Sequence, residues 1–226
     1  MRPFPRALRA GTLVRRYKRF LADICFPDGA VECVHCPNPG AMTGLAEHGS
    51  AVLVSKSDDS RRKLAWTWEM VRVGRIWVGV NTQIANRVVG HWLKTRRLFP
   101  EYGEVRSEVR RGAARFDFVL DNRCVLEVKS VTLASGQIGA FPDSVTERGR
   151  RHVEELARLR REGWRAVLFY FVARSDVTHV RPADEVDPEY GRALRRAAAD
   201  GVEVVAIGAR FTRRGVSMGP FLEVVL

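Results

Sequence analysis

Apolar and polar residues alternate over short distances in the first eighty positions of the chain. Runs rich in Val, Leu, Ile and Trp are separated by turn-forming residues such as Pro27-Asp28-Gly29 and Val73-Gly74. This alternation predicts short strands. They are expected at residues 12–18, 20–26, 30–36, 51–55, 64–73 and 75–80. So many short strands in one stretch favour a small closed barrel, for example an OB-like β-barrel.

The spacing of apolar residues changes after residue 80. Apolar residues recur at helical spacing between Thr82, a possible cap, and Lys94. A second helix is predicted over residues 144–161, because Ser144-Val-Thr-Glu147 fits a capping box. A third is expected at 188–200, and strands at 104–110, 115–120, 124–133, 166–172, 202–207 and 221–225. The fold expected is α+β or α/β with two domains: the barrel at 1–80 and a mixed-sheet α/β domain at 81–226.

Residues 115–133, RFDFVLDNRCVLEVKSVTL, predict a β-hairpin whose turn is Asp121-Asn122-Arg123. If Asn122 is the apex of a three-residue turn, facing residues have numbers that sum to 244. Asp117 then lies opposite Glu127, with Cβ atoms about 5 Å apart, and like charges in this position repel. Lys129 lies two residues after Glu127 and so shares its face of the strand.

A divalent cation would relieve the repulsion between these two carboxylates, because Mg²⁺ prefers carboxylate oxygens and water. The predicted catalytic set is Asp117, Glu127 and Lys129, with Mg²⁺ or Mn²⁺ as the cofactor. Such a metal polarises a phosphate and activates water, and Lys129 positions that water or stabilises negative charge. Glu108 is a further candidate ligand, or an exposed acid among arginines. The alternative for the whole set is a solvated face with an ion pair at Lys129.

The net charge of the chain indicates what kind of partner it binds. The chain has 38 Lys and Arg against 26 Asp and Glu, a formal net charge of +12. A surplus of this size attracts polyanions, and nucleic acid is the first candidate. The alternative is a general bias of an Arg-rich proteome. An aromatic residue among bases, as in Arg15-Arg16-Tyr17-Lys18-Arg19, suits base stacking together with phosphate neutralisation.

The predicted nucleic-acid contacts lie on barrel loops and at the start of the second helix. They are Arg15, Arg16, Tyr17, Lys18, Arg19, Arg61, Arg62, Lys63 and Arg148. Each basic run is also explained as a solvated surface. Arg148 and His152 share a helix face. The roles of Asp143, Glu147 and His152 stay open.

A zinc site, a signal peptide and a membrane span are not expected. Cys33-Val-His-Cys36 is a lone C-x-x-C pair, and a structural zinc site normally needs four ligands, so no zinc is expected. Residues 1–11 contain no apolar run of signal-peptide length, and no stretch is long enough to span a bilayer. We therefore expect a cytoplasmic protein without a membrane partner.

Several stretches together resemble the sugar fermentation stimulation protein A (SfsA) family. They are GTLVRRYKRFLADI, HCPNPGAMTG, RKLAWTWE, VGVNTQIANRVV, RFDFVL, EVKSVTL and FPDSVTERGRRHVEEL. Asp117…Glu127-Val128-Lys129 resembles the PD-(D/E)xK nuclease motif. The resemblance implies an OB-like N-terminal barrel, a restriction-endonuclease-like second domain, DNA binding in which Asn38 takes part, and a regulatory effect on sugar metabolism. One departure is Pro39, which removes a backbone N–H from the loop that begins at Asn38.

The function predicted is that of a DNA-binding protein, largely without sequence preference, whose nuclease-like metal site hydrolyses phosphodiesters. One alternative is a non-catalytic transcriptional regulator that kept the acids as a relic of its fold. Another is an RNA-processing nuclease, since an OB-like barrel accepts single strands of either kind.

Overall fold

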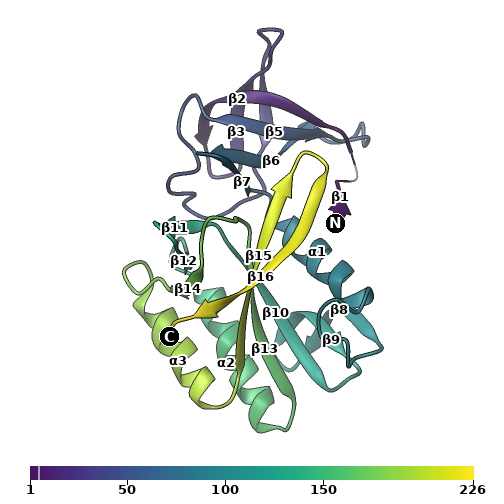
Figure 1. Ribbon diagram of the computed structural model, residues 1–226, viewed down its shortest axis with the longest axis vertical. Helices are drawn as coiled ribbons and strands as arrows, with labels where there is room; N and C mark the ends of the chain where they lie inside the picture. Colours follow the sequence, from purple (N-terminus) through teal and green to yellow (C-terminus); the bar gives the residue numbers. More distant parts are fainter. Residues whose placement is uncertain (5) are drawn as a thin grey trace.

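Two β-sheets organise the chain in the computed structural model, which describes residues 1–4 and 6–226. The first sheet lies at the top of Figure 1 and the second, with all three helices, lies below it. The hairpin of β15 (Glu203–Thr212) and β16 (Gly215–Val224) reaches from the second sheet towards the first. No helix in the described part of the chain has the length and apolar character needed to cross a membrane.

The first sheet is the predicted barrel. Its strands are β2 (Leu8–Tyr17), β3 (Leu21–Cys25), β4 (Val31–His35), β5 (Ala51–Lys56), β6 (Trp66–Val73) and β7 (Ile76–Gly79). They follow the order β4-β3-β2-β5-β6-β7, and a bridge between His35 and Thr67 joins β4 to β6 and closes the ring. Fully buried side chains such as Leu13, Ile24 and Trp68 fill its core. The first barrel strand, β2, begins at Leu8, whereas the sequence predicted a start at residue 12.

The second sheet has ten strands in a mixed arrangement. Besides β15 and β16 it contains β1 (Arg2–Pro3), β8 (Val105–Arg111), β9 (Ala114–Leu120), β10 (Cys124–Val131), β11 (Leu133–Ser135), β12 (Ile138–Phe141), β13 (Arg165–Val172) and β14 (His179–Pro182). The order is β11-β12-β14-β16-β15-β13-β10-β9-β8. β13 runs parallel to both β10 and β15, and seven of its eight residues are buried, as expected for a central strand covered on both faces.

Helices cover both faces of this sheet. α1 (Gln83–Lys94) contributes Trp92 to a core that includes Leu126 and Phe171 on one face. α2 (Glu147–Arg161) and α3 (Pro188–Ala199) pack on the opposite face around residues such as Tyr170. The predicted mixed-sheet α/β domain is therefore confirmed.

The predicted capping box at Ser144 is wrong. α2 begins at Glu147, and Thr146 is its cap, with Oγ1 accepting from Gly149 N at 3.1 Å. The backbone N–H of Thr146 donates to Asp187 Oδ2 at 2.8 Å, so a distant carboxylate takes the part expected of Glu147.

Thr82 does occupy the cap position of α1, but its side chain does not cap the helix. Its hydroxyl donates to the Pro37 carbonyl at 2.8 Å. Asn81 Oδ1 instead accepts from the backbone N–H of Gln83 at 3.1 Å. The helix start is therefore tied to a barrel loop.

Four short strands were not predicted, namely β1, β11, β12 and β14, and the β15–β16 hairpin is longer than expected. β1 matters most, because it pairs with β16 through Arg2–Val216 and Pro3–Gly215. A Cβ on Gly215 would collide with the Arg2 carbonyl oxygen, so glycine permits the pairing. The division expected at residue 80 is thus crossed by the N-terminal strand.

Candidate functional site

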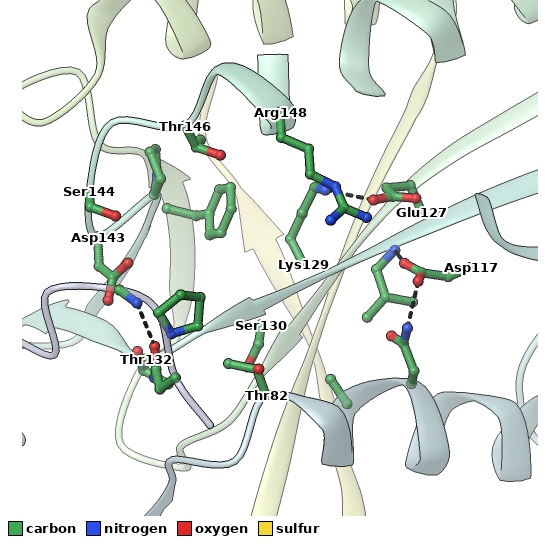
Figure 2. A pocket seen from close by; sticks show the side chains of 18 of the residues that line it. Thr82, Asp117, Glu127, Lys129, Ser130, Thr132, Asp143, Ser144, Thr146 and Arg148 are labelled. Atoms are coloured by element: carbon green, nitrogen blue, oxygen red, sulfur yellow. Dashed lines mark hydrogen bonds and ion pairs between the residues drawn. The ribbon is translucent and has the colours of Figure 1, made fainter. Parts of the chain in front are cut away.

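A cleft of about 620 Å³ lies where the barrel loop 38–40 meets the second domain. The predicted catalytic residues Asp117, Glu127 and Lys129 all line it. Figure 2 shows their side chains grouped together, with Arg148 extending over Lys129 and Glu127. Hydroxyl-bearing residues also line the cleft, namely Thr82, Ser130, Thr132, Ser144 and Thr146. The cleft is therefore polar and contains both charges.

The register of the β9–β10 hairpin places the two acids together. The pairs are Cys124–Leu120, Val125–Val119 and Leu126–Phe118, whose numbers sum to 244 as predicted. Asp121 and Asn122 have positive φ angles of 45° and 53°, which give the turn its tight bend. Asp117 and Glu127 come next in this register, and both face the cleft.

Asp117 accepts hydrogen bonds from two neighbours. The backbone N–H of Val128 donates to Oδ2 at 2.7 Å, and Asn86 Nδ2 donates to Oδ1 at 2.5 Å. Burial and the adjacent carboxylate of Glu127 nevertheless raise the pKa of Asp117 to about 6. Asp117 is therefore held in a place where its negative charge is unfavourable.

Glu127 is 4 % exposed and has unequal surroundings at its two oxygens. Oε1 accepts from Lys129 Nζ at 2.6 Å and contacts His152 Nδ1. Oε2 is buried and has no hydrogen-bond partner among the described residues. Burial opposes ionisation, but the contacts with His152 and Lys129 outweigh it and hold the pKa of Glu127 below its usual value.

His152 is closer to the acids than the sequence indicated. It is buried on α2, with Nδ1 against Glu127, and its Nε2 faces Arg148 Nε at 3.5 Å. Arg148 lies on the exposed side of the same helix face and lines the cleft. The sequence signal was the shared face of residues four apart. Only the packing of α2 on the sheet shows that this face meets Glu127.

Glu108 does not join the site, which corrects its prediction as a metal ligand. Flanking pairs Ser107–Phe118 and Val109–Phe116 sum to 225, so Asp117 would be the partner of Glu108. Glu108 has a φ of 56° and leaves this pairing. Its half-exposed side chain forms an ion pair with Arg115 at 3.0 Å instead.

The predicted contact residues at the end of β2 have different hydrogen-bond partners. Arg15 pairs with Asp23 at 2.7 Å, and the Tyr17 hydroxyl also contacts Asp23, at 3.0 Å. Arg16 donates to the carbonyls of Asn38 and Gly40 at 2.9 and 2.8 Å. Arg16 therefore holds the barrel loop in place, and the structure does not bring Arg15 or Tyr17 to the cleft.

Lys18 and Arg19 form the turn after β2, with positive φ angles of 48° and 63°. Both are exposed, and Arg19 lines the cleft. Asn38 lines it too, although its side chain is 3 % exposed and its Oδ1 accepts from Gly40 N at 2.9 Å. Of the predicted barrel contacts, Arg19 and Asn38 thus line the same cleft as the acids.

Arg61, Arg62 and Lys63 lie between β5 and β6, outside the set of residues that line the cleft. Arg61 pairs with Asp59 at 2.9 Å, and Arg62 donates to Thr67 Oγ1 at 3.3 Å. These bases form a separate exposed loop.

Asp143 connects the two domains beside the cleft. Its Oδ2 accepts from the backbone N–H of Met42 at 3.2 Å. A Cβ on Gly40 would collide with this carboxylate, so the close approach requires glycine. Asp143 therefore positions the loop that carries Asn38, a role that the sequence left open.

Asp117 and Glu127 offer carboxylate oxygens, the ligand type that divalent cations take. Both side chains line the cleft, Asp117 with a raised pKa and Glu127 with an unpartnered oxygen. No group of three or more His, Cys, Asp or Glu suited to a metal occurs among residues 1–4 and 6–226. Two carboxylates with the remaining positions left to water fit Mg²⁺, which usually keeps several waters.

Comparison with known proteins identifies the chain. A model described as the SfsA N-terminal OB domain matches residues 14–80, and one described as the sugar fermentation stimulation protein RE domain matches residues 83–215. A sugar fermentation stimulation protein homolog of Geobacter sulfurreducens is 45% identical, covering 98% of this chain and 97% of its own. The homolog of Thioalkalivibrio sulfidiphilus is 46% identical, with 99% and 98% covered.

A solved structure has the same fold. It is that of Pyrococcus furiosus SfsA in complex with Ca²⁺, with a TM-score of 0.90, 22% identity, and 100% of this chain and 98% of that chain covered. The chain therefore belongs to the sugar fermentation stimulation protein family, with an N-terminal OB domain followed by a mixed-sheet α/β domain.

Proposed function

We propose that the chain is a metal-dependent nuclease that binds DNA and hydrolyses its phosphodiester bonds in the cleft. The observation that carries this proposal is that buried Glu127 and half-buried Asp117 line the same cleft together with Lys129. A protein that needed these acids only for solubility would leave them exposed, since removing a carboxylate from water is unfavourable.

A divalent cation accounts for the features that hydrogen bonds leave unexplained. It would take the unpartnered Oε2 of Glu127 and an oxygen of Asp117 as ligands. When bound, it supplies Lewis-acid activation of phosphate and acidification of a water molecule. Ca²⁺ in the complex of Pyrococcus furiosus SfsA supports a divalent cation in this fold, and Mg²⁺ or Mn²⁺ is the ion proposed for catalysis.

The side chains around the acids have separate tasks in this proposal. Lys129 Nζ lies 2.6 Å from Glu127 Oε1, where it can also hold a water or a phosphate oxygen. Arg148, exposed at the edge of the cleft, supplies a fork of donors for a phosphate. Arg19 supplies a second positive charge from the barrel side.

Binding in this proposal depends mainly on phosphate contacts. The net charge of +12 and the arginines at the cleft give attraction without base recognition. We therefore expect weak sequence preference and affinity that falls steeply with salt. The effect on sugar metabolism that names the family would follow from binding or cutting DNA.

The test is cleavage of plasmid, single-stranded DNA and RNA by pure protein with Mg²⁺, Mn²⁺ or EDTA. Wild-type protein is compared with Lys129→Ala and with Lys94→Ala, which removes an exposed lysine at the end of α1. We expect metal-dependent cleavage of DNA that Lys129→Ala loses and Lys94→Ala keeps.

Each other outcome counts against the proposal. DNA binding without cleavage in any metal would favour a non-catalytic regulator. Preferential cleavage of RNA would favour an RNA-processing nuclease. Equal cleavage by Lys129→Ala and wild type would indicate a contaminating nuclease.

A further inference from the structure

A second basic hollow lies beside α2 and joins the cleft. It has a volume of about 640 Å³ and contains five arginines, Arg115, Arg148, Arg151, Arg158 and Arg161. Arg148 lines both this hollow and the cleft. His152 also lines the hollow, and its other side contacts Glu127. The hollow therefore begins one side chain away from the proposed metal ligands.

Three of these arginines have no carboxylate partner among the described residues. Arg148, Arg151 and Arg161 form none of the ion pairs found there. The two glutamates in the hollow are engaged, Glu155 with Arg158 at 2.8 Å and Glu154 with Arg150 at 3.9 Å. Positive charge is thus left over in a concave surface.

A neighbouring helix has fewer unpaired arginines. On α3, Arg192 pairs with Glu189, and Arg195 pairs with Asp184 at 2.6 Å. On α3 only Arg196 lacks an ion pair among the described residues, whereas Arg148, Arg151 and Arg161 on α2 all lack one. Arginines without an ion pair in the described part of the chain also line another hollow, namely Arg75, Arg210 and Arg213, so what distinguishes the α2 set is that Arg148 also lines the cleft.

We propose that this hollow is a phosphate-binding track for the DNA strand that leaves the cleft. The inference rests on the proposed function and adds where the substrate runs. Arg148 and Arg161 are thirteen positions apart on α2, a rise of about 20 Å at 1.5 Å per residue. At about 3.4 Å per nucleotide for a stacked strand, the track spans about six phosphates.

The arginines suit this ligand chemically. Each guanidinium offers several donors in a planar fork that matches phosphate oxygens. Arg148 would hold a phosphate beside the scissile bond, and Arg151 and Arg161 would hold phosphates farther along the strand. Contacts that hold the substrate and the transition state equally well strengthen substrate binding without altering the chemical step.

The test uses Arg151→Gln/Arg161→Gln in the full chain. The matched control is Arg75→Gln/Arg213→Gln, which removes two arginines from a hollow that Trp77 lines outside the cleft. A labelled 20-nucleotide single-stranded DNA is titrated in EDTA at several salt concentrations. Cleavage of the same DNA is then measured with Mg²⁺.

We expect the α2 variant to lower the slope of log affinity against log salt by about 1.4, at about 0.7 per phosphate contact. Affinity at 0.1 M salt should fall on the order of tenfold, with a matching rise in KM and a kcat within about twofold of wild type. The control should keep the wild-type slope. Unchanged unfolding temperatures will show that both variants fold.

Two results would contradict the proposal of a phosphate-binding track. If wild type binds and cuts DNA but the two double variants behave alike, the track is absent while the proposed function stands. If wild type neither binds nor cuts nucleic acid, both proposals fail together.

Discussion

Glu69 in the barrel and Glu127 in the second domain are both buried glutamates, with exposed fractions of 6 % and 4 %. Glu69 has a neutral donor for each oxygen, since Ser55 Oγ donates to Oε1 at 2.6 Å and Asn81 Nδ2 donates to Oε2 at 2.8 Å. Glu127 has two nitrogen partners at Oε1, none at Oε2, and a second carboxylate nearby.

The difference shows how to separate a structural buried acid from a functional one. Hydrogen bonds satisfy Glu69 completely, so nothing about it calls for a ligand. At Glu127 the protein keeps an unpartnered oxygen and tolerates a like charge, both of which reduce stability. Such an arrangement is expected where stability is given up for ligand binding or chemistry.

The largest expected effect is on DNA cleavage, where substitutions of the two glutamates should differ. Glu127→Gln should reduce metal-dependent DNA cleavage by about 10³-fold or more, because it removes a ligand charge from the proposed cation site. Glu69→Gln should cut DNA within about twofold of wild type. Initial rates at saturating Mg²⁺ measure both. Equal losses of cleavage activity in the two variants would contradict the different roles assigned to Glu69 and Glu127.

Asp117→Asn should stabilise the protein in EDTA. Asp117 has a pKa of about 6 against an ordinary value of 3.8, so at pH 7 its ionised form costs about 3 kcal/mol in the folded state. Removing the charge should recover up to this amount, read as a higher unfolding temperature for the variant at pH 7.

The difference in unfolding free energy between wild type and Asp117→Asn should grow as the pH rises. A raised folded pKa means that the folded state binds the proton more tightly, so Asp117 favours folding below pH 3.8 and loses this contribution between pH 3.8 and 6. The gap between wild type and Asp117→Asn should therefore be full above pH 6 and shrink towards pH 4. A variant less stable than wild type at pH 7 would contradict the expected like-charge penalty.

Divalent cations should stabilise wild type and Glu69→Gln alike. At a Ca²⁺ concentration one hundred times its Kd, binding to the folded state adds about 2.7 kcal/mol. Asp117→Asn and Glu127→Gln should lose this shift in unfolding temperature. A shift that survives in both variants would place the cation elsewhere.

The smallest effect tests the structural role of Glu69. Ser55→Ala removes the donor at 2.6 Å from Glu69 Oε1 and should cost about 1–2 kcal/mol of unfolding free energy. Urea unfolding measures this loss, and the Ca²⁺ shift and DNA cleavage should stay at wild-type values. Loss of the Ca²⁺ shift in this variant would show that Glu69 belongs to the cation site.

The hairpin geometry was predictable because turn length and side-chain alternation together fix the register. Asp117 and Glu127 came together for that reason, and Lys129 followed from the two-residue period of a strand. The barrel was predictable too, since short strands and frequent turns favour few other folds.

What the sequence could not provide depends on backbone conformation and distant packing. The φ of 56° at Glu108 turns an apparently suitable ligand away, and glutamate gives no local signal for it. His152 meets Glu127 only because α2 packs on β13 and β9, the strands on either side of β10. Arg16 was predicted as a nucleic-acid contact, yet it donates to loop carbonyls more than twenty residues away.

The pairing of β1 with β16 also sets an order of events during synthesis. Arg2 and Pro3 leave the ribosome long before their partners Gly215 and Val216 are made. At translation rates of about 5–20 residues per second, the N-terminal strand waits roughly 10–40 s for its place in the sheet. The barrel can close meanwhile, since its strands end at Gly79, so the two domains are joined at this edge only after β16 has been made.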